Sequence, residues 1–303
     1  MALSILRPGM FTTVQDLGRW GLQSRGVPVS GALDWYSHRL ANNLLRNDAA
    51  MATLEATLIG PEIRFEADAV WAITGAVFRL TLDGAAVEMN CAIHARAGSV
   101  LKFGERVRGS RAYIAVAGGI DVPDTLGSRS THVLTGMGGH EGRALKAGDT
   151  LRTGVAKDVQ APEVSSRVRL TASPVRFDRT LRVIPADDRL FEHIASQPFH
   201  VSPRSDRMGY RLEGAAIGGA PRGGLISTAV PTGAIQVPPT GQPILLMNDR
   251  ATTGGYAIAG TVITADLPIA AQLGPGDDVR FEPCSLDTAV AALREREALL
   301  GAA

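Results

Sequence analysis

Lysine is scarce in this sequence. Only Lys102, Lys146 and Lys157 are lysines among 31 basic residues, so arginine carries almost all of the positive charge. A P-loop needs lysine in a Gly-Lys-Ser/Thr setting to reach nucleotide phosphates, and none of the three has those neighbours. A biotin carrier holds its lysine between methionines, and no lysine here has a methionine neighbour. The sequence therefore predicts neither a P-loop ATPase nor a biotin carrier.

Cysteine and long apolar runs are also in short supply. Cys91 and Cys284 are too few and too far apart for a disulfide framework or a zinc site. No run approaches the ~20 apolar residues of a membrane helix, and Arg7 and Pro8 interrupt the first apolar stretch. The 31 basic residues balance 30 acidic ones. We therefore expect a cytoplasmic protein with neither a membrane nor a nucleic-acid partner.

Familiar catalytic and cofactor motifs are missing as well. The six histidines show no HExxH or other close ligand pair, which leaves a metal site without support from the sequence. No Gly-x-Ser-x-Gly nucleophile elbow is present. The glycines of residues 136–142 resemble a dinucleotide loop, but no strand and helix of a βαβ unit flank them, so this segment is interpreted as a turn.

Glycine and proline are plentiful instead, and they indicate a mostly β fold. The 34 glycines and 17 prolines repeatedly interrupt short runs rich in Val, Ile, Leu and Thr. Expected strands are 63–65, 70–74, 78–82, 100–103, 111–116, 181–184, 236–237, 244–246, 256–263 and 278–281. Helices are expected at 33–45 and 187–196, and Ser285 is expected to cap a C-terminal helix.

The chain is expected to consist of two β-rich halves. The polar stretch 155–180 contains Pro162 and Pro174 and separates two segments of similar length. Residues 146–152 and 274–280 each place a Gly-Asp turn before an expected strand, which suggests a duplication. We therefore predict an N-terminal half over 1–160 and a C-terminal half over 161–303.

Two polar segments of the first half are candidates for function. One carries Gln15, Asp16 and Arg19 and continues to Ser30 and Asp34, where Ser30 is expected to cap the next helix at a gain of about 1 kcal/mol. The other joins hydroxyls to an arginine beside a turn, a combination suited to a carboxylate or phosphate; its residues are Ser128, Arg129 and Thr131. A turn with a helix cap and a strand-end turn explain the same residues without a ligand.

Two further polar segments lie in the second half. Arg204, Arg207 and Arg211 fall within eight residues, and guanidinium groups bind carboxylate or phosphate bidentately, so this cluster fits an anion clamp. A solvated network of ion pairs would look similar. Farther along the chain, amide, carboxylate and hydroxyl groups that suit a small amide ligand are carried by Gln236, Asp249 and Tyr256. Each segment taken singly fits a structural role at least as well.

Taken together and in this order, these segments resemble the allophanate-hydrolase-subunit-2 family, also described as the biotin-dependent carboxyltransferase or KipI-antagonist family. The resemblance covers about residues 7–283. It is carried by TTVQDLGR at 12–19, GVPVSGALD at 26–34, LEATLIGP at 54–61, LGSRST at 126–131, RSDRMGYR at 204–211 and IQVP at 235–238 through GGY at 254–256.

The resemblance implies a cyclophilin-like β-barrel architecture. It also implies that a free-standing chain of this length serves as the C subunit of a prokaryotic 5-oxoprolinase. Such a complex opens 5-oxo-L-proline to L-glutamate with ATP, which enters at the level of the complex. The implied partners are two separate subunits, one KipI-like and the other LamB/YcsF-like. The isolated chain is expected to be inactive.

Residue chemistry suggests how such a site would work. We expect Arg204 and Arg207 to hold anionic oxygens, while Gln236 and Asp249 engage the lactam amide. Replacing Arg207 with alanine is then expected to abolish turnover by the complex. The remaining candidates are expected to complete the substrate cleft or to meet the KipI-like partner; they are Gln15, Asp16, Arg19, Ser30, Asp34, Ser128, Arg129, Thr131 and Tyr256.

Two other functions stay open at this point. The chain could be half of a biotin-dependent carboxyltransferase that acts on urea or a related amide, with biotin on another chain, and a neighbouring biotin-carboxylase gene would favour this. It could instead be a non-enzymatic regulator that binds a KipI-like kinase inhibitor, which predicts tight binding without substrate-dependent ATP hydrolysis.

Overall fold

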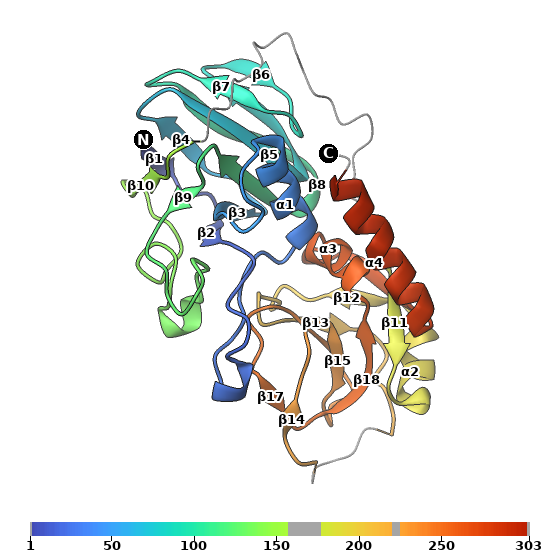
Figure 1. Cartoon of the computed structure of the whole chain (residues 1–303). Helices are drawn as coiled ribbons and strands as arrows, with labels where there is room; N and C mark the ends of the chain where they lie inside the picture. Colours follow the sequence, from blue (N-terminus) through green and yellow to red (C-terminus); the bar gives the residue numbers. More distant parts are fainter. Residues whose placement is uncertain (1, 157–176, 220–224, 302–303) are drawn as a thin grey trace. The chain divides into compact units, whose positions relative to one another are not determined.

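The structure is a computed structural model that describes residues 2–156, 177–219 and 225–301. Its chain forms two compact units (Figure 1). Unit 1 comprises the described residues of Met1–Arg19, Ser30–Arg176 and Leu299–Ala303, and unit 2 those of Trp20–Val29 and Phe177–Ala298. The short segment 20–29 therefore groups with residues that lie far along the chain.

Unit 1 is built around a ten-stranded sheet in the order β2-β3-β8-β4-β1-β10-β9, with β5 pairing β6, β7 and β8. All of its pairings are antiparallel. The strands are β1 Ala2–Arg7, β2 Phe11–Gln15, β3 Thr53–Thr57, β4 Glu62–Phe65, β5 Ala69–Leu82, β6 Ala85–Val87, β7 Ile93–Ala95, β8 Val100–Val116, β9 Ile120–Asp121 and β10 Thr150–Thr153.

Two long strands replace four short ones that the sequence suggested. The expected strands 70–74 and 78–82 are one strand, β5, and 100–103 with 111–116 are one strand, β8. The ladder between them shifts register after Gly75, where the φ angle of +88° suits only glycine. A methyl group on Gly75 would lie 2.4 Å from the carbonyl oxygen of Arg111. Gly75 thus marks a bulge inside β5, not a turn between strands.

The apolar core of unit 1 follows the alternation of its strands. Phe65 and Trp71 are buried and stack with ring centroids 5.9 Å apart. Leu3, Ile5 and Ile63 from neighbouring strands join the same cluster. Burying an aromatic or branched side chain contributes about 1.5–3 kcal/mol, so this cluster supplies much of the stability of the unit.

Helix α1, Trp35–Leu44, packs on β5 and β8 through small side chains and Tyr113. Its N-cap is Asp34, whose Oδ1 accepts a hydrogen bond from the Ser37 backbone N–H at 2.8 Å. The expected cap at Ser30 is wrong, because Ser30 lies four residues upstream in a left-handed conformation with a φ angle of +56°. A short 3-10 helix, η2, spans Val133–Thr135, and the glycines after it occupy turns, as the sequence indicated.

Unit 2 is a closed barrel with the strand order β11-β18-β15-β16-β13-β12-β19, beside a small β14-β17 pair (Figure 1). Its only parallel pairing among the described residues joins β11 to β19. The strands are β11 Thr180–Pro185, β12 Phe199–Val201, β13 Gly209–Glu213, β14 Thr228–Ala229, β15 Ala234–Val237, β16 Ile244–Leu246, β17 Thr253–Gly254, β18 Ala257–Val262 and β19 Asp278–Pro283.

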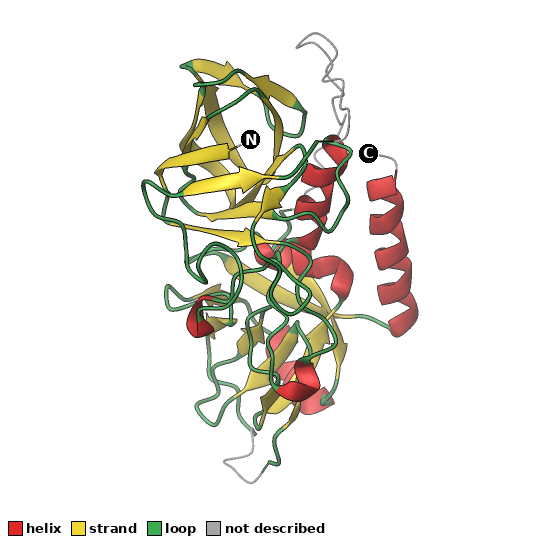
Figure 2. Ribbon diagram, turned by 60° about the vertical axis from the view of Figure 1, so that its left-hand side comes forward, coloured by secondary structure: helices red, strands yellow, loops and turns green. Residues whose placement is uncertain are grey.

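Helices in unit 2 are short, apart from the C-terminal one. They are η1 Gln23–Arg25, α2 Asp188–Ala195, η3 Thr264–Asp266, α3 Leu267–Ala271 and α4 Leu286–Gly301, which ends in unit 1. Ser285 Oγ accepts a hydrogen bond from the Thr288 N–H at 3.2 Å, so the expected cap of α4 is confirmed. Strands outnumber helices in both units (Figure 2), and the expected mostly β, barrel-type fold with a C-terminal helix is confirmed. None of the described helices is long and apolar enough to cross a membrane.

His38 on α1 is fully buried among polar groups of unit 1. Its Nε2 lies 3.1 Å from the Ala49 carbonyl oxygen, which can only accept, so Nε2 carries the proton. The Nδ1 atom lies 2.9 Å from Thr53 Oγ1 and accepts from that hydroxyl. Burial lowers the pKa of His38 to about 4, so the histidine is neutral in the folded protein near neutral pH.

This burial predicts acid sensitivity. Unfolded His38 takes up a proton near its ordinary pKa of 6.5, whereas folded His38 takes one up only near pH 4. The unfolded chain therefore binds more protons between these values, and stability falls as pH falls, by up to about 3 kcal/mol. Urea unfolding between pH 7 and 4.5 should show this loss in the wild type and a smaller one in His38→Gln. His94→Gln, at an exposed position of β7, controls for the loss of a histidine as such; equal slopes in all three proteins would contradict the prediction.

Candidate functional site

Asp16, directly after β2, collects hydrogen bonds from the second polar segment. Its carboxylate accepts from the Ser128 hydroxyl at 2.7 Å, from the Arg129 N–H at 2.5 Å and from the Gly18 N–H at 2.8 Å. The Ser130 hydroxyl donates to it as well. Asp16 is 8% exposed. One carboxylate thus joins two segments that lie more than a hundred residues apart in the sequence. From the sequence alone these segments were interpreted as separate turns.

Gln15 and Arg19 strengthen the same junction. The Gln15 Nε2 atom donates to Thr131 O at 3.1 Å, and Thr131 Oγ1 donates to Val14 O at 2.9 Å. Arg19 is almost completely buried, and its guanidinium donates to Ser130 O at 2.6 Å and Thr125 O at 3.2 Å. We name the set Gln15, Asp16, Arg19, Ser128, Ser130 and Thr131 the Asp16 junction. Its contacts hold one loop against another inside unit 1.

The loop at 30–34 rests on this junction and on a buried acid that the sequence reasoning missed. The Ala32 N–H donates to Asp16 O at 2.8 Å, and a methyl on Gly31 would lie 2.8 Å from the Gly18 nitrogen. Glu55 accepts from the Leu33 N–H at 2.9 Å and from the Tyr113 hydroxyl at 2.7 Å. An acidic residue between the apolar Leu54 and Ala56 of β3 was the available signal.

Tyr113 and Asp34 extend this buried network. The Asp34 N–H donates to the Tyr113 hydroxyl at 2.8 Å, while the Asp34 carboxylate caps α1. Burial raises the pKa of Tyr113 well above its ordinary value, with the nearby Glu55 charge adding to the effect. Tyr113 is therefore a neutral donor to Glu55, and the Asp34 contacts position the start of the helix.

In unit 2, two of the predicted catalytic residues form a buried ion pair. Arg207 Nε lies 2.9 Å from Asp249 Oδ2, and Arg207 Nη2 lies 3.2 Å from Asp249 Oδ1. Both side chains are more than nine-tenths buried. The Asp249 N–H also donates to Arg207 O at 3.0 Å. Planar guanidinium and carboxylate groups matched in this bidentate way make strong, well-oriented contacts.

The other predicted residues of unit 2 differ in exposure. Arg204 is largely exposed, and its Nη2 atom lies 3.5 Å from Glu213 Oε1. Tyr256 is 49% exposed between β17 and β18. Gln236 on β15 is buried, and its Nε2 atom has no hydrogen-bond partner among the described residues. Arg207, Asp249 and Gln236 are therefore the buried members of the predicted set in this unit.

One buried cation beside this set was missed by the sequence reasoning. Arg250 is 6% exposed, follows Asp249 directly and closes a turn in which its N–H donates to Met247 O at 3.2 Å. Its Nε atom donates to Val230 O at 2.9 Å. Arg250 lies inside a segment that the sequence analysis had singled out. The sequence does not show, however, that Asp249 pairs with Arg207 and not with the adjacent Arg250.

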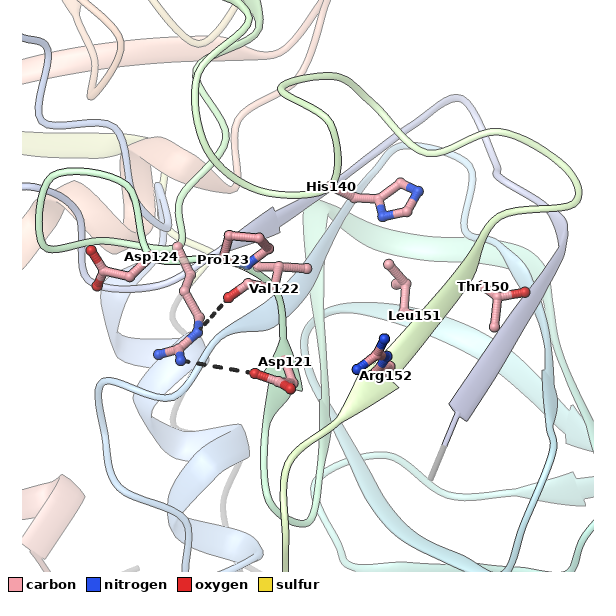
Figure 3. A pocket seen from close by; sticks show the side chains of 9 residues that line it. Asp121, Val122, Pro123, Asp124, His140, Thr150, Leu151 and Arg152 are labelled. Atoms are coloured by element: carbon pink, nitrogen blue, oxygen red, sulfur yellow. Dashed lines mark hydrogen bonds and ion pairs between the residues drawn. The ribbon is translucent and has the colours of Figure 1, made fainter.

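Unit 1 also has a surface hollow of about 480 Å³ beside β9 and β10 (Figure 3). Arg129, a predicted site residue, lies at its wall: its Nε donates to Val122 O at 2.9 Å, and its Nη2 lies 3.9 Å from Asp121. The remaining lining residues are Pro123, Asp124, His140, Thr150, Leu151 and Arg152. The lining includes two arginines and two aspartates, so the hollow favours neither sign of charge. In the part of the chain that the structure describes, no group of three or more His, Cys, Asp and Glu side chains could hold a metal ion.

The fold and these residues define a two-unit β protein with a buried Arg-Asp pair and an amide-bearing strand in its barrel. Residues 25–283 match the family described as carboxyltransferase domain, subdomain A and B, and the chain belongs to this family.

Relatives include separate subunits and parts of larger enzymes. The chain is 40% identical to the C subunit of the Escherichia coli 5-oxoprolinase, over 97% of this chain and 95% of that protein. It is 35% identical to urea amidolyase of Lachancea kluyveri over 95% of its own length but only 17% of that protein. The crystal structure of the K. lactis urea amidolyase superposes with a TM-score of 0.86 at 31% identity, over 99% of this chain and 20% of that one.

The Asp16 junction predicts a large effect of a small substitution. In Asp16→Asn the carboxylate loses its charge and one acceptor oxygen becomes a donor that faces hydroxyl and N–H groups. We expect the free energy of unfolding to fall by about 2–4 kcal/mol. The control is Asp48→Asn, because Asp48 is exposed and accepts from the Ala50 N–H at 2.8 Å; its loss should stay below about 1 kcal/mol. Equal losses in urea unfolding would show that the junction does not act as a structural tie.

Proposed function

We propose that this chain is the C subunit of an ATP-dependent 5-oxoprolinase, a cytoplasmic complex that opens 5-oxo-L-proline to L-glutamate. The observation that carries the proposal is the match to the C subunit of the E. coli 5-oxoprolinase along nearly the full length of both chains. The proposed partners are two further subunits, one KipI-like and the other LamB/YcsF-like. The isolated chain is proposed to be inactive, since these partners complete the site.

Hydrolysis of a lactam requires oriented polar groups around the amide. A lactam resists hydrolysis because amide resonance must be broken, and phosphorylation of the amide oxygen by ATP creates a better electrophile. The residues described in this chain include no P-loop lysine, so ATP is assigned to the complex and not to a residue of this chain. What this chain can supply is positioning and electrostatic stabilisation, which is often the largest catalytic contribution.

The geometry of unit 2 supports a role for Asp249 and Gln236 at the lactam. Arg207 fixes the Asp249 carboxylate through two hydrogen bonds, so Arg207 orients this group. Asp249 then accepts from the lactam N–H, and the unpartnered Gln236 amide donates to the lactam carbonyl. Arg204 is exposed and remains the proposed contact for anionic oxygens at the rim.

A second candidate function is supported by the match to the fused enzyme. Urea amidolyase of L. kluyveri contains a segment 35% identical to this chain, so a carboxyltransferase half acting on urea or a similar amide is the alternative. Biotin would then be attached to another chain. The two functions differ in what the reconstituted system consumes: 5-oxoproline with ATP, or carboxybiotin with urea.

The test is reconstitution with the candidate KipI-like and LamB/YcsF-like partners, followed by an assay of glutamate released from 5-oxoproline with ATP. We expect turnover by the complex and none by this chain alone. Asp249→Asn, which keeps an acceptor for Arg207, should lower kcat by about 100-fold or more without loss of assembly. Asp206→Asn, in the exposed turn before β13, is the matched control and should keep wild-type turnover. No glutamate from a correctly assembled wild-type complex would refute the proposed function.

A further inference from the structure

Arg250 is a buried cation that has no acid partner among the described residues. Its side chain makes one hydrogen bond, from Nε to Val230 O, and no carboxylate of the described residues forms an ion pair with it. The neighbouring acid, Asp249, is engaged by both Nε and Nη2 of Arg207. Asp249 and Arg207 thus neutralise each other, and no carboxylate in the described part of the chain balances the positive charge of Arg250.

An unbalanced buried arginine is costly to the fold. Guanidinium stays protonated under all ordinary conditions, so the protein cannot relieve the cost by releasing the proton. Burial alone lowers the pKa of Arg250, with no opposing carboxylate to offset it. Buried charges are normally paired, and titratable groups with perturbed pKa values cluster at functional sites. An anion would balance the charge of Arg250.

Gln236, on a strand of the same unit, is a second buried polar residue with an unsatisfied donor. Its Nε2 atom is buried and donates to nothing among the described residues. Gly254 on β17 faces it: a methyl on Gly254 would lie 2.5 Å from Gln236 Nε2 and 3.5 Å from Val230 Cγ1. Gly254 does not adopt the left-handed conformation that favours glycine. The absence of a side chain on Gly254 therefore makes room for the Gln236 amide itself.

Val230 places the two groups together. Its carbonyl oxygen accepts from Arg250, and its Cγ1 atom lies next to the point where the Gln236 amide packs against Gly254. Pairing of β14 with β17 and the hydrogen bond from the Val230 N–H to Thr252 O, at 3.1 Å, fix this arrangement. A buried cation and a buried amide donor thus border one residue of unit 2. Among the described residues the cation has no carboxylate partner and the amide nitrogen has no acceptor.

We propose that Arg250 and Gln236 form a subsite that binds a small carboxylic acid carrying an amide, with the carboxylate on Arg250 and the amide carbonyl on Gln236. This assignment rests on the proposed function, in which the ligand is 5-oxoproline. Arginine binds a carboxylate through two parallel hydrogen bonds, which gives orientation as well as affinity. Arg250 then selects the substrate by its acid group, and Asp249 remains available for the lactam N–H.

The test compares 5-oxoproline with 2-pyrrolidinone, the same lactam without the carboxylate, in the assembled complex. Arg250→Met should lower kcat/KM for 5-oxoproline by about 100-fold or more and leave turnover of 2-pyrrolidinone within about threefold. Arg250→Lys should recover part of the loss. Arg189→Met, on the exposed face of α2, is the matched control and should change neither. Equal losses for both lactams would overturn the subsite.

A binding measurement separates this inference from the proposed function. If the wild-type complex releases no glutamate, the function fails, and calorimetry of the full chain still tests the subsite. Wild type should then bind 5-oxoproline at least tenfold more tightly than 2-pyrrolidinone, a preference that Arg250→Met removes. Absence of that preference overturns the proposal. If Arg250→Met abolishes the binding of inorganic phosphate but leaves the binding of 5-oxoproline unchanged, Arg250 binds a phosphoryl group instead. That result also overturns the proposal.

The free energy of unfolding of the Arg250→Met variant distinguishes a binding role of Arg250 from a structural one. Because no described acid pairs with Arg250, Arg250→Met should unfold at the same or a higher urea concentration than the wild type without ligand. A marked loss of stability in this variant, together with unchanged ligand preference, would identify Arg250 as a structural residue.

Discussion

The ion pair between Arg207 and Asp249 is the contact on which the candidate site of unit 2 depends. Two hydrogen bonds at 2.9 and 3.2 Å bind the carboxylate on one side and fix its orientation. Removal of either partner would leave a buried charge, which costs about 3–5 kcal/mol. The same pair withdraws Asp249 from its neighbour Arg250. One interaction therefore orients the proposed lactam acceptor and leaves a cation ready for an anionic group.

Unit 1 meets the same constraint on buried charge in a different way. Asp16 and Glu55 are matched by hydroxyl and backbone N–H donors from the chain itself, so their electrostatic needs are met without a ligand. The four donors on the Asp16 carboxylate favour a structural role for the Asp16 junction, which shapes the loops of unit 1. In unit 2, Arg250 has no carboxylate partner and Gln236 Nε2 no acceptor among the described residues, and for this reason the proposed substrate contacts are assigned to unit 2.

Sequence patterns predicted the class of fold, the helices α1, α2 and α4 and most strands of unit 2, because alternation and capping are local; the short helix α3 was missed. They missed β2, since Thr12, Thr13 and Gln15 look like a polar turn yet are buried by pairing with β3 and by the Asp16 junction. They also split β5 at Gly75, because a bulge and a turn use the same residue. For the candidate site, the sequence identified the polar segments but not the contacts between their side chains. No local pattern shows that the Asp249 carboxylate binds Arg207 and not the adjacent Arg250.

A double-mutant cycle on the ion pair tests this account most directly. Arg207→Met, Asp249→Asn and the double variant would be unfolded in urea as full-length chains, and the coupling free energy obtained from the four stabilities. The account predicts a coupling of about 2 kcal/mol or more, because each residue neutralises the other in a buried setting. Additive losses, within about 0.5 kcal/mol, would show that Arg207 does not hold Asp249 and would contradict the account.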